Sequence, residues 1–589
     1  MIKMSEYYDI IINNGLMVDG TGNPRYKGSL AISDEKIVSI SGEKISGSAD
    51  KIIEAEGLVV SPGFIDVHNH GDLSILYYPD APGFIRQGIT TFVGGQCGDS
   101  PGPFGEYIGL PWVLSDLYEE IDPSMYVKEW LQPRDKVNER HREVYGWDID
   151  WNTMGDFFHR VKDNGLAPNY VPMVGHGDIR SLVMGPDYKR EATDSEIKEM
   201  VQHTRRAMEE GCRGITTGRD YDPGIWATFD EVLECAKAAA RYEGIYQSHC
   251  LRTGHRKPRR PGEWPPKKTE GVLEAIEIGR KAEVPVQISH LGVLFDIRPS
   301  DKHVTKAAIE STLSIIDDAI QEGIEVDFDT IPHHLTGGIS TTPWLIHTLQ
   351  PWLRIAGSAE QLGRALRMKE FRREIKEALY KGKHYYFNPN INPDWAKQRI
   401  IAVCDNQDYL EKSISEIAEE LNKDELETLF RILIEDPHTK AVRKGDDDWV
   451  KLEFYKHPNM MIGIDTFAVD DKRESRFNPP SYPNQNSYGG FPHYLRRAVR
   501  ETSTLTLEEA IRKVTCEPSR KFRIEKRGIL QQGAYADITI FDIKTINDNG
   551  TQIEPRKYPE GIEYVIVNGE TVFDGKGTGS RPGRILYRK

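Results

Sequence analysis

Apolar runs rich in β-branched residues alternate with amphipathic helical stretches from about residue 57 to residue 332 of the 589-residue chain. The helical stretches "TDSEIKEMVQHTRRAMEEG", "TFDEVLECAKAAARYEG" and "IESTLSIIDDAIQEG" end at glycine, and the runs "CRGITTG", "IYQSHC" and "IEVDFDTIP" follow them directly. Glycine commonly ends helices, and short helix-to-strand connections imply parallel strands. So many consecutive units favour an α/β fold with a closed (β/α)8 TIM-like barrel over an open doubly wound sheet. No G-x-G-x-x-G motif opens a helix after the first strand, which argues against a dinucleotide-binding sheet.

Both ends of the chain are rich in predicted strands, such as "DIIINNGLMVDG" near the start and "IEYVIVNGETVFDG" near the end. We therefore predict one small β-sandwich domain built from residues 1–61 and 519–589, with two separate β modules as the alternative. The barrel is predicted to span residues 62–518. Residues 336–456 interrupt its rhythm with charged, helix-rich sequence, which predicts a helical insertion that covers the active site.

Composition and charge narrow the range of partners. The formal net charge of −15 argues against nucleic acid and against an anionic membrane surface. No apolar run approaches the roughly 18 residues that cross a bilayer, and the N-terminus "MIKMSEYYDIII" lacks a signal-peptide pattern. The six cysteines are scattered, with no C-x-x-C pair, which is typical of reduced thiols. We predict a cytoplasmic protein. A homo-oligomer is the one protein association that we include among the expected partners.

Histidines stand at the carboxyl ends of several predicted strands. His68 and His70 follow the run "GFID", and side chains two apart on a strand point to one face. His249 ends "IYQSH", His290 ends "VPVQISH", and Asp465 ends "NMMIGID". Taken singly, each has a plain structural explanation, such as a hydrogen bond to a neighbouring loop. Because strand ends converge on one face of a barrel, we predict that these side chains meet at one site.

Cys97 lies in "GGQCG", directly after the strand "ITTFV". It could be a buried spacer, half of a disulfide, a nucleophile or a metal ligand. A reducing compartment argues against the disulfide, and a nucleophilic cysteine would leave the surplus histidines without a role. A thiolate beside imidazoles and a carboxylate suits zinc. We therefore predict one or two zinc ions, with the ligands His68, His70, Cys97, His249, His290 and Asp465.

Several motifs occur together along nearly the whole chain. They include "SPGFIDVHNHGD", "GITTFVGGQCG", "VGHGDIR", "VPVQISHL", "MIGID" and the tail "YPEGIEYVIVNGETVFDGKGTGSRPGRIL". This set resembles the amidohydrolase superfamily and, within it, the N-acyl-D-amino-acid deacylases (D-aminoacylases). The cysteine of "GGQCG" is typical of the deacylase branch, where it replaces the carboxylated lysine of hydantoinase-like relatives.

The resemblance implies a division of labour among the predicted ligands. Cys97, His249 and His290 would form the tight zinc site, while His68, His70 and Asp465 would border a weaker one. Asp465 is also the implied catalytic base, which takes a proton from the attacking water and delivers it to the departing nitrogen. The implied reaction is hydrolysis of the amide bond of an N-acyl-D-amino acid or a related N-acyl compound, so a small-molecule amide is the expected substrate.

The expected substrate pocket departs from the family pattern. Arg252 lies one residue beyond the family's His-x-Arg position, Gly292 replaces a lysine that reaches the substrate carboxylate, and His333 replaces a tyrosine. We retain Arg252 and His333 as predicted substrate-binding residues. A buried substrate carboxylate needs cationic and hydrogen-bonding partners, and two of the family's partners are replaced here. The alternative is therefore an amidohydrolase that acts on a cyclic amide (hydantoinase- or dihydroorotase-like) or on another non-peptide C–N bond. A non-catalytic scaffold is disfavoured because all six predicted ligands are present.

Overall fold

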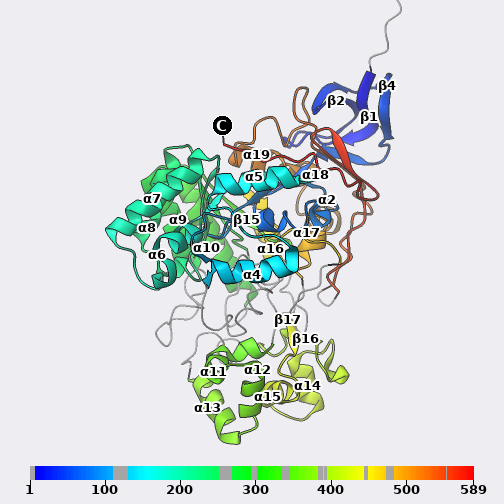
Figure 1. Ribbon diagram of the computed structural model, residues 1–589. Coiled ribbons are helices and arrows are strands. Elements are labelled where there is room, and N and C mark those ends of the chain that lie inside the picture. The colour runs from blue at the N-terminus through cyan, green and yellow to red at the C-terminus, as the bar shows by residue number, and fades with distance from the viewer. Residues whose placement is uncertain are drawn as a thin grey trace, which may run out of the picture.

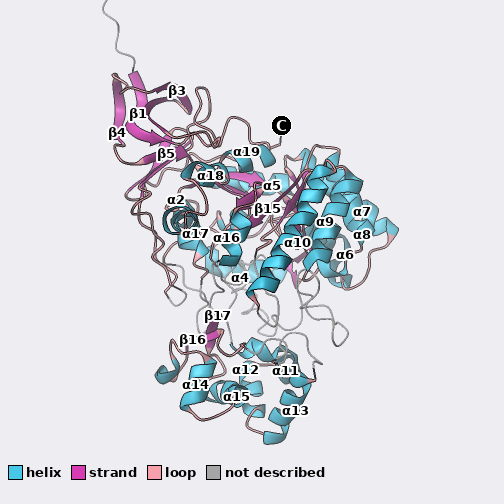
Figure 2. Cartoon of the chain, turned by 180° about the vertical axis from the view of Figure 1, so that it is seen from behind, coloured by secondary structure: helices cyan, strands magenta, loops and turns pink. Residues whose placement is uncertain are grey.

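Figure 1 shows the computed structural model, which describes residues 7–109, 131–250, 268–292, 301–333, 345–381, 389, 394–443, 449–472, 483–551 and 554–588. A sheet built from strands near both ends of the chain lies at one end of the molecule. A barrel of strands and helices occupies the middle, and a smaller helical body lies at the opposite end (Figures 1 and 2).

The two ends of the chain share one eight-stranded sheet with the order β21-β20-β19-β5-β1-β2-β3, in which β4 also pairs with β1. Its strands are β1 (Tyr7–Met17), β2 (Tyr26–Ser33), β3 (Lys36–Ser41), β4 (Ser48–Glu54), β5 (Val59–Pro62), β19 (Ile538–Phe541), β20 (Ile562–Val567) and β21 (Glu570–Asp574). The halves meet where β5 pairs antiparallel with β19, with Val60 opposite Ile540. Asn568 and Gly569 connect β20 to β21 with φ values of 48° and 83°, as expected for a tight hairpin turn.

The barrel strands form two parallel sheets that join at both ends. One has the order β10-β7-β6 and the other β11-β12-β13-β14-β15-β18. Only Met173 separates β10 (Asn169–Pro172) from β11 (Val174–Gly175). At the other seam, the Val67 N–H donates to the Ile462 carbonyl at 3.4 Å. With β10 and β11 counted as one, the described residues supply eight parallel strands in barrel order, in agreement with the predicted (β/α)8 fold. The remaining strands are β6 (Phe64–Asp66), β7 (Ile89–Gly94), β12 (Gly214–Gly218), β13 (Ile245–His249), β14 (Val286–Ile288), β15 (Val326–Thr330) and β18 (Met460–Ile462).

Amphipathic helices follow the barrel strands, and side-chain caps fix where several begin. Thr193 and Glu196 form a capping box at the start of α7 (Asp194–Glu209), which satisfies amide groups that the helix itself leaves open. Gly211 ends this helix at φ 112°, a conformation that favours glycine. The other helices around the barrel are α1 (Gly71–Ser74), α2 (Pro82–Ile85), α4 (Arg134–Tyr145), α5 (Met154–Asn164), α6 (His176–Met184), α8 (Phe229–Ala240), α9 (Lys268–Ala282), α10 (Lys302–Gln321), α17 (Asn486–Leu495), α18 (Leu507–Arg512) and α19 (Cys516–Lys521).

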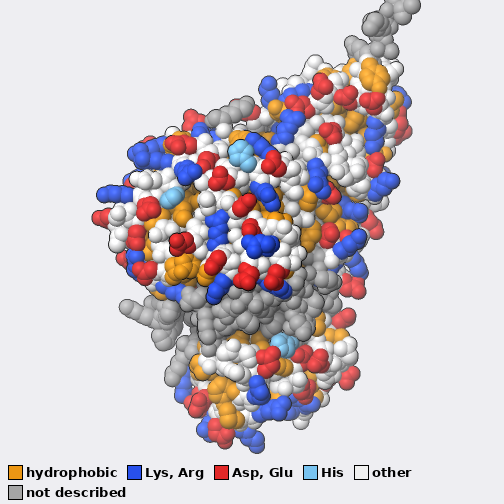
Figure 3. Space-filling model, in the orientation of Figure 1, with side chains coloured by type: hydrophobic (Ala, Val, Ile, Leu, Met, Phe, Trp, Pro, Cys, Tyr) orange, Lys and Arg blue, Asp and Glu red, His pale blue; other side chains and the backbone are white. Residues whose placement is uncertain are grey.

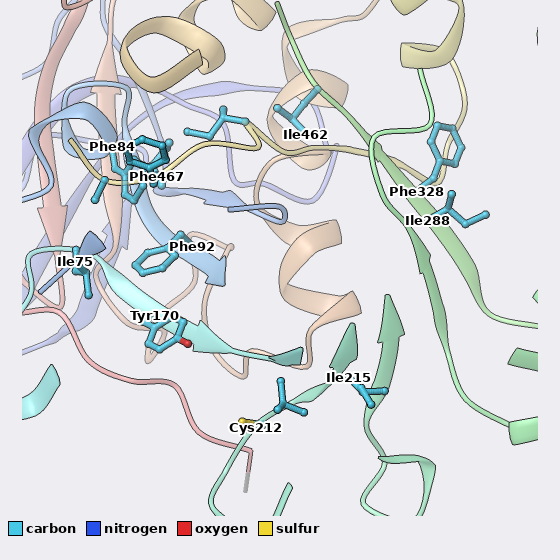
Figure 4. Packing of buried hydrophobic residues seen from close by; sticks show 14 of the residues in the cluster. Ile75, Phe84, Phe92, Tyr170, Cys212, Ile215, Ile288, Phe328, Ile462 and Phe467 are labelled. Atoms are coloured by element: carbon cyan, nitrogen blue, oxygen red, sulfur yellow. The ribbon is translucent and has the colours of Figure 1, made fainter. Parts of the chain in front are cut away.

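A continuous apolar cluster holds the strands to these helices. Figure 4 shows a part of it, with Phe84, Phe92 and Tyr170 close together. The rings of Phe92 on β7 and Tyr170 on β10 stack with centroids 5.0 Å apart, and both side chains are fully buried. Burial of each such side chain contributes roughly 1.5–3 kcal/mol, so this packing fixes how neighbouring strands lie.

The helical body lies between β15 and β18 in the chain, inside the range predicted as an insertion. Its described elements are α11 (Gln350–Ala356), α12 (Ala359–Ala365), α13 (Lys369–Tyr380), β16 (Arg399–Val403), α14 (Ile414–Glu420), α15 (Glu425–Glu435) and β17 (Lys440–Arg443). They enclose their own apolar cluster, which includes Leu362, Phe430 and Leu433. In contrast, α16 (Trp449–Tyr455) places Phe454 in the barrel cluster. The body therefore branches from the carboxyl end of β15, the side of the barrel where the strand ends converge.

The last described residues leave the terminal sheet and return to the barrel. The Tyr170 N–H donates to the Arg584 carbonyl at 2.8 Å, and the Leu586 N–H donates to the Tyr170 carbonyl at 2.7 Å. Ile585, between them, belongs to the barrel cluster. The predicted C-terminal segment thus contributes to the barrel as well as to the terminal sheet.

Basic and acidic side chains are interspersed on the face of the molecule in Figure 3. Within the described parts of the chain, every helix is too short or too polar to traverse a bilayer.

Candidate metal centre

All six predicted metal ligands come together at the carboxyl ends of the barrel strands. They form two groups that share Cys97, and within each group the candidate ligand atoms lie within 4.8 Å of one another. The groups are His68, His70, Cys97 and Asp465, and Cys97, His249 and His290. Each of these side chains is buried. The convergence expected of strand ends in a barrel is therefore observed.

Cys97 occupies the centre of the cluster. Its Sγ lies 3.2 Å from His68 Nε2, 3.3 Å from His249 Nδ1 and 3.5 Å from His290 Nε2. Sulfur and nitrogen ligands of one tetrahedral zinc ion lie about 3.6 Å apart, so these spacings match a shared cation. Burial alone would raise the pKa of the Cys97 thiol, but the nearby imidazoles outweigh burial and hold the pKa well below its usual value. The thiol is thus set to ligate as a thiolate.

Asp465 lies beside His68 and His70, the two histidines that follow β6. Its Oδ1 lies 3.2 Å from His70 Nε2 and 3.4 Å from His68 Nε2. Its backbone N–H donates to the His68 carbonyl at 2.8 Å, which ties the loop after β18 to the end of β6. Burial opposes ionisation of Asp465, but His68 and His70 lower its pKa overall. An ionised carboxylate in this position can ligate a cation or accept a proton.

The backbone around the cluster is unusual. Cys97, His290 and Asp465 have φ values of 57°, 39° and 48°, in the left-handed region that side chains other than glycine seldom adopt. Such conformations cost about 1–3 kcal/mol each and persist where the surroundings enforce them. Gly463 allows one close approach, because a Cβ there would lie 2.3 Å from the His68 Cβ. The chain is thus constrained where the candidate ligands meet.

Two further carboxylates contact the cluster. Asp329 Oδ1 lies 3.3 Å from His68 Nδ1 and accepts the His290 N–H at 2.8 Å. Asp220 Oδ2 lies 3.8 Å from His249 Nε2. Carboxylates beside the second ring nitrogen orient histidine ligands in metal sites. The sequence analysis did not identify either residue, although an acidic residue inside the apolar strand "VDFDT" was a usable signal for Asp329.

The structure describes only one of the two predicted substrate-binding residues. Arg252 lies outside the described residues. His333 follows β15, and its ring packs against His493 with centroids 3.9 Å apart. A Cβ at Gly292 would lie 2.7 Å from Thr330 Oγ1 and 3.2 Å from a ring carbon of Phe454. A longer side chain at this position therefore has no room without local movement.

The chain is similar to known proteins along almost its whole length. A model described as "Amidohydrolase family" matches residues 480–573. The D-aminoacylase of Alcaligenes xylosoxydans xylosoxydans is 28% identical over 99% of this chain and 98% of its own, and the N-acyl-D-glutamate deacylase of the same organism has the same values. A crystal structure of N-acyl-D-glutamate deacylase from Bordetella bronchiseptica, complexed with zinc and a phosphonate inhibitor, is 26% identical with a TM-score of 0.69, and the match covers 99% of this chain and 100% of that one. These full-length similarities confirm the predicted resemblance to the amidohydrolase superfamily and, within it, to the N-acyl-D-amino-acid deacylases.

Proposed function

We propose that this chain is a zinc-dependent amidohydrolase that cleaves the amide bond of N-acyl-D-amino acids or a related N-acyl compound. The observation that carries the proposal is the buried cluster of four imidazoles, one thiol and one carboxylate. The similarity along almost the whole chain to proteins named D-aminoacylase and N-acyl-D-glutamate deacylase also supports the proposal.

The donor set fits zinc on chemical grounds. Nitrogen and sulfur donors at these spacings suit a tetrahedral zinc ion, and buried anions such as Cys97 and Asp465 require a compensating cation. Cys97, His249 and His290 would hold the tighter ion, and His68, His70 and Asp465 would border a second position. When bound, zinc supplies Lewis acidity that activates water and polarises an amide carbonyl.

The side chains of this protein perform the proton transfers and the positioning. Asp465 would accept a proton from the attacking water at its carboxylate and then donate it to the departing amide nitrogen. Asp329 would hold His68 and the backbone of His290 in place from outside the cluster. Burial of the cluster excludes bulk water, which strengthens each of these charge interactions.

The substrate class follows less directly from this chain's residues. Arg252 and His333 remain the predicted substrate-binding residues. Gly292 offers no carboxylate-binding side chain, and a Cβ there would lie 2.7 Å from Thr330 Oγ1, which favours hydrolysis of a cyclic amide or another non-peptide C–N bond as the second candidate function. Either substrate is a small-molecule amide.

Three further predictions concern the cover over the site, the cellular compartment and self-association. We propose that the helical body covers the site, because it branches from the carboxyl end of β15, where the candidate ligands converge. We also propose a cytoplasmic location, since the six cysteines are free thiols, as is typical of a reducing compartment. Homo-oligomer formation stays a prediction.

A substrate panel tests the function. Purified, zinc-loaded protein is assayed on matched N-acetyl-D- and N-acetyl-L-amino acids, hydantoins and simple amides. We expect release of free amino acid from the D series. Ring opening of a hydantoin without hydrolysis of any N-acetyl-D-amino acid would replace the leading function with the second. No turnover of any amide by protein that contains zinc would contradict both.

A further inference from the structure

A second group of candidate metal ligands lies apart from the cluster described above. It consists of His333 after β15, His493 on α17 and Asp548 in the segment before β20, and its candidate ligand atoms lie within 4.8 Å of one another. The three side chains are 8%, 10% and 6% exposed, so they meet in an almost dry environment. They also come from three segments that are distant in the sequence.

Both imidazoles approach the same carboxylate oxygen. Asp548 Oδ2 lies 3.1 Å from His493 Nδ1 and 3.3 Å from His333 Nε2. Two ligands of one tetrahedral zinc ion with nitrogen or oxygen donors lie about 3.3 Å apart, given metal–ligand distances near 2.0–2.1 Å. Two imidazoles and one carboxylate, with a further position for water, are a donor set that zinc accepts.

The surrounding residues hold these three side chains in position. The His333 N–H donates to Asn486 Oδ1 at 3.1 Å, and the Lys451 ammonium donates to the His333 carbonyl. α17 departs from helical geometry at Gly489, where a Cβ would lie 2.8 Å from the Asp548 Cβ. Lack of a side chain at Gly489 therefore lets the Asp548 segment approach the helix. Preorganised ligands of this kind lower the entropic cost of metal binding.

Arg496 sets the charge of the group. Its guanidinium donates to Asp548 Oδ1 at 2.8 Å and leaves Oδ2 directed at the imidazoles. Burial opposes ionisation of Asp548, but His493, His333 and Arg496 together lower its pKa to about 2. Arg496 Nη2 also lies 3.3 Å from His493 Nδ1, so an incoming cation must displace this contact. Arg496 thus orients the carboxylate while it weakens the affinity for a cation.

We propose that His333, His493 and Asp548 bind a zinc ion that is separate from the catalytic cluster and has a structural role. The ion would join the segment that leads from β15 towards the helical body, the helix α17 and the segment before β20. It would thus fix the base of the insertion relative to the barrel. The proposal does not depend on the hydrolytic function, because none of its three ligands belongs to the catalytic cluster. Zinc ligation by His333 would replace the predicted role of this residue in substrate binding.

Metal content of the full-length protein tests the proposal. Wild type, His493→Gln and His457→Gln are loaded with zinc, freed of excess metal by gel filtration and analysed by mass spectrometry. His457 is the matched control, a buried imidazole whose Nε2 lies 3.1 Å from the Asp317 carboxylate. We expect His493→Gln to hold one zinc fewer than wild type and His457→Gln to hold the same number. Equal zinc content in wild type and His493→Gln would overturn the proposal.

A second measurement covers the case in which His493→Gln also disturbs the catalytic cluster. A Cys97→Ala/His290→Ala background removes the thiol that both catalytic groups share and one imidazole of the tighter group, and added zinc should still raise the melting temperature, since a ligand that binds only the folded state stabilises it. Addition of Asp548→Asn to this background should make the rise smaller, and Arg496→Gln should enlarge it at subsaturating zinc. A melting temperature that does not respond to zinc in this background, or an equal response with Asp548→Asn, would also overturn the proposal.

Discussion

Replacement of Asp329 by asparagine tests whether this carboxylate positions the metal ligands. Asp329 Oδ1 faces His68 Nδ1 at 3.3 Å and accepts the His290 N–H at 2.8 Å, while Oδ2 accepts from Gln287 at 3.1 Å. Asparagine has the same shape and keeps one acceptor oxygen, but it removes the negative charge. It also places an amide NH₂ group either against the Gln287 donor or against His68 and His290. Either arrangement loses a contact that the aspartate makes.

The expected magnitude follows from these contacts. Loss of a carboxylate that orients histidine ligands typically costs roughly 10–100-fold in metal affinity, or about 1.4–2.8 kcal/mol. Asp329→Ala should lower the zinc affinity further, because it also leaves the buried His290 N–H without its acceptor. An unpaired buried N–H costs about 1–3 kcal/mol, so the loop that holds His290 would no longer be fixed in the ligating position. The order of zinc affinity is therefore expected to be wild type, then Asp329→Asn, then Asp329→Ala.

Competition with a chromophoric zinc chelator measures this order directly, and thermal unfolding of the metal-free proteins separates lost affinity from lost stability. Asp220→Asn is a matched comparison, since Asp220 lies further from its imidazole, 3.8 Å from His249 Nε2. Its effect should be smaller than that of Asp329→Asn. Unchanged zinc affinity in Asp329→Asn, with the protein folded, would refute the role of this carboxylate in positioning the ligands.

Three other substitutions probe the catalytic base, the crowded pocket position and a buried charge. Asp465→Asn should lower turnover roughly 10²–10⁴-fold while zinc stays largely bound, and near wild-type turnover would remove Asp465 from the proton transfers. Gly292→Lys, which restores the family's residue, should lower the free energy of unfolding in urea by roughly 1–3 kcal/mol because its Cβ meets filled space; higher activity on N-acyl-D-amino acids without loss of stability would contradict this. Glu231 is buried, yet the neighbouring His176 imidazole and the Arg180 guanidinium lower its pKa from 4.5 to about 2. The ionised group therefore stabilises the fold above pH 4.5, and this contribution of roughly 3 kcal/mol is lost as the pH falls towards 2. The stability difference between wild type and Glu231→Gln should therefore shrink over this range in acid unfolding, and a constant difference would exclude the linkage.

Much of the fold could be predicted because local signals agree with the tertiary structure. Helix caps such as Thr193 and the Asn568–Gly569 turn are encoded within a few residues, so they are visible in the sequence. Domain limits are less visible, because packing decides them. The helix α16 lies within the predicted insertion but packs Phe454 on the barrel, and the chain after β21 returns to β10. Apolar residues such as Phe454 can pack on either body, so pattern alone does not assign them.

The same distinction applies to the site. The candidate ligands occupy strand ends, and the barrel brings strand ends together whatever the intervening sequence. Asp329 lies inside a strand, and its contact with His68 depends on which strands are neighbours and on their register, such as Ile288 beside Phe328. The group of His333, His493 and Asp548 joins a barrel loop, a helix and a C-terminal segment. No local pattern encodes that meeting.

The charges of the catalytic cluster explain why its strained backbone can persist. Two buried anions, Cys97 and Asp465, have lowered pKa values because imidazoles surround them, and the pKa of His70 rises to about 10 even though burial opposes this. Without a metal, protons on the imidazoles must therefore balance the anions. Zinc would replace those protons, because an imidazole ligates only in its neutral form. Metal binding should then release protons, so the affinity for zinc rises with pH, and the free energy of binding helps to offset the cost of the left-handed conformations at Cys97, His290 and Asp465.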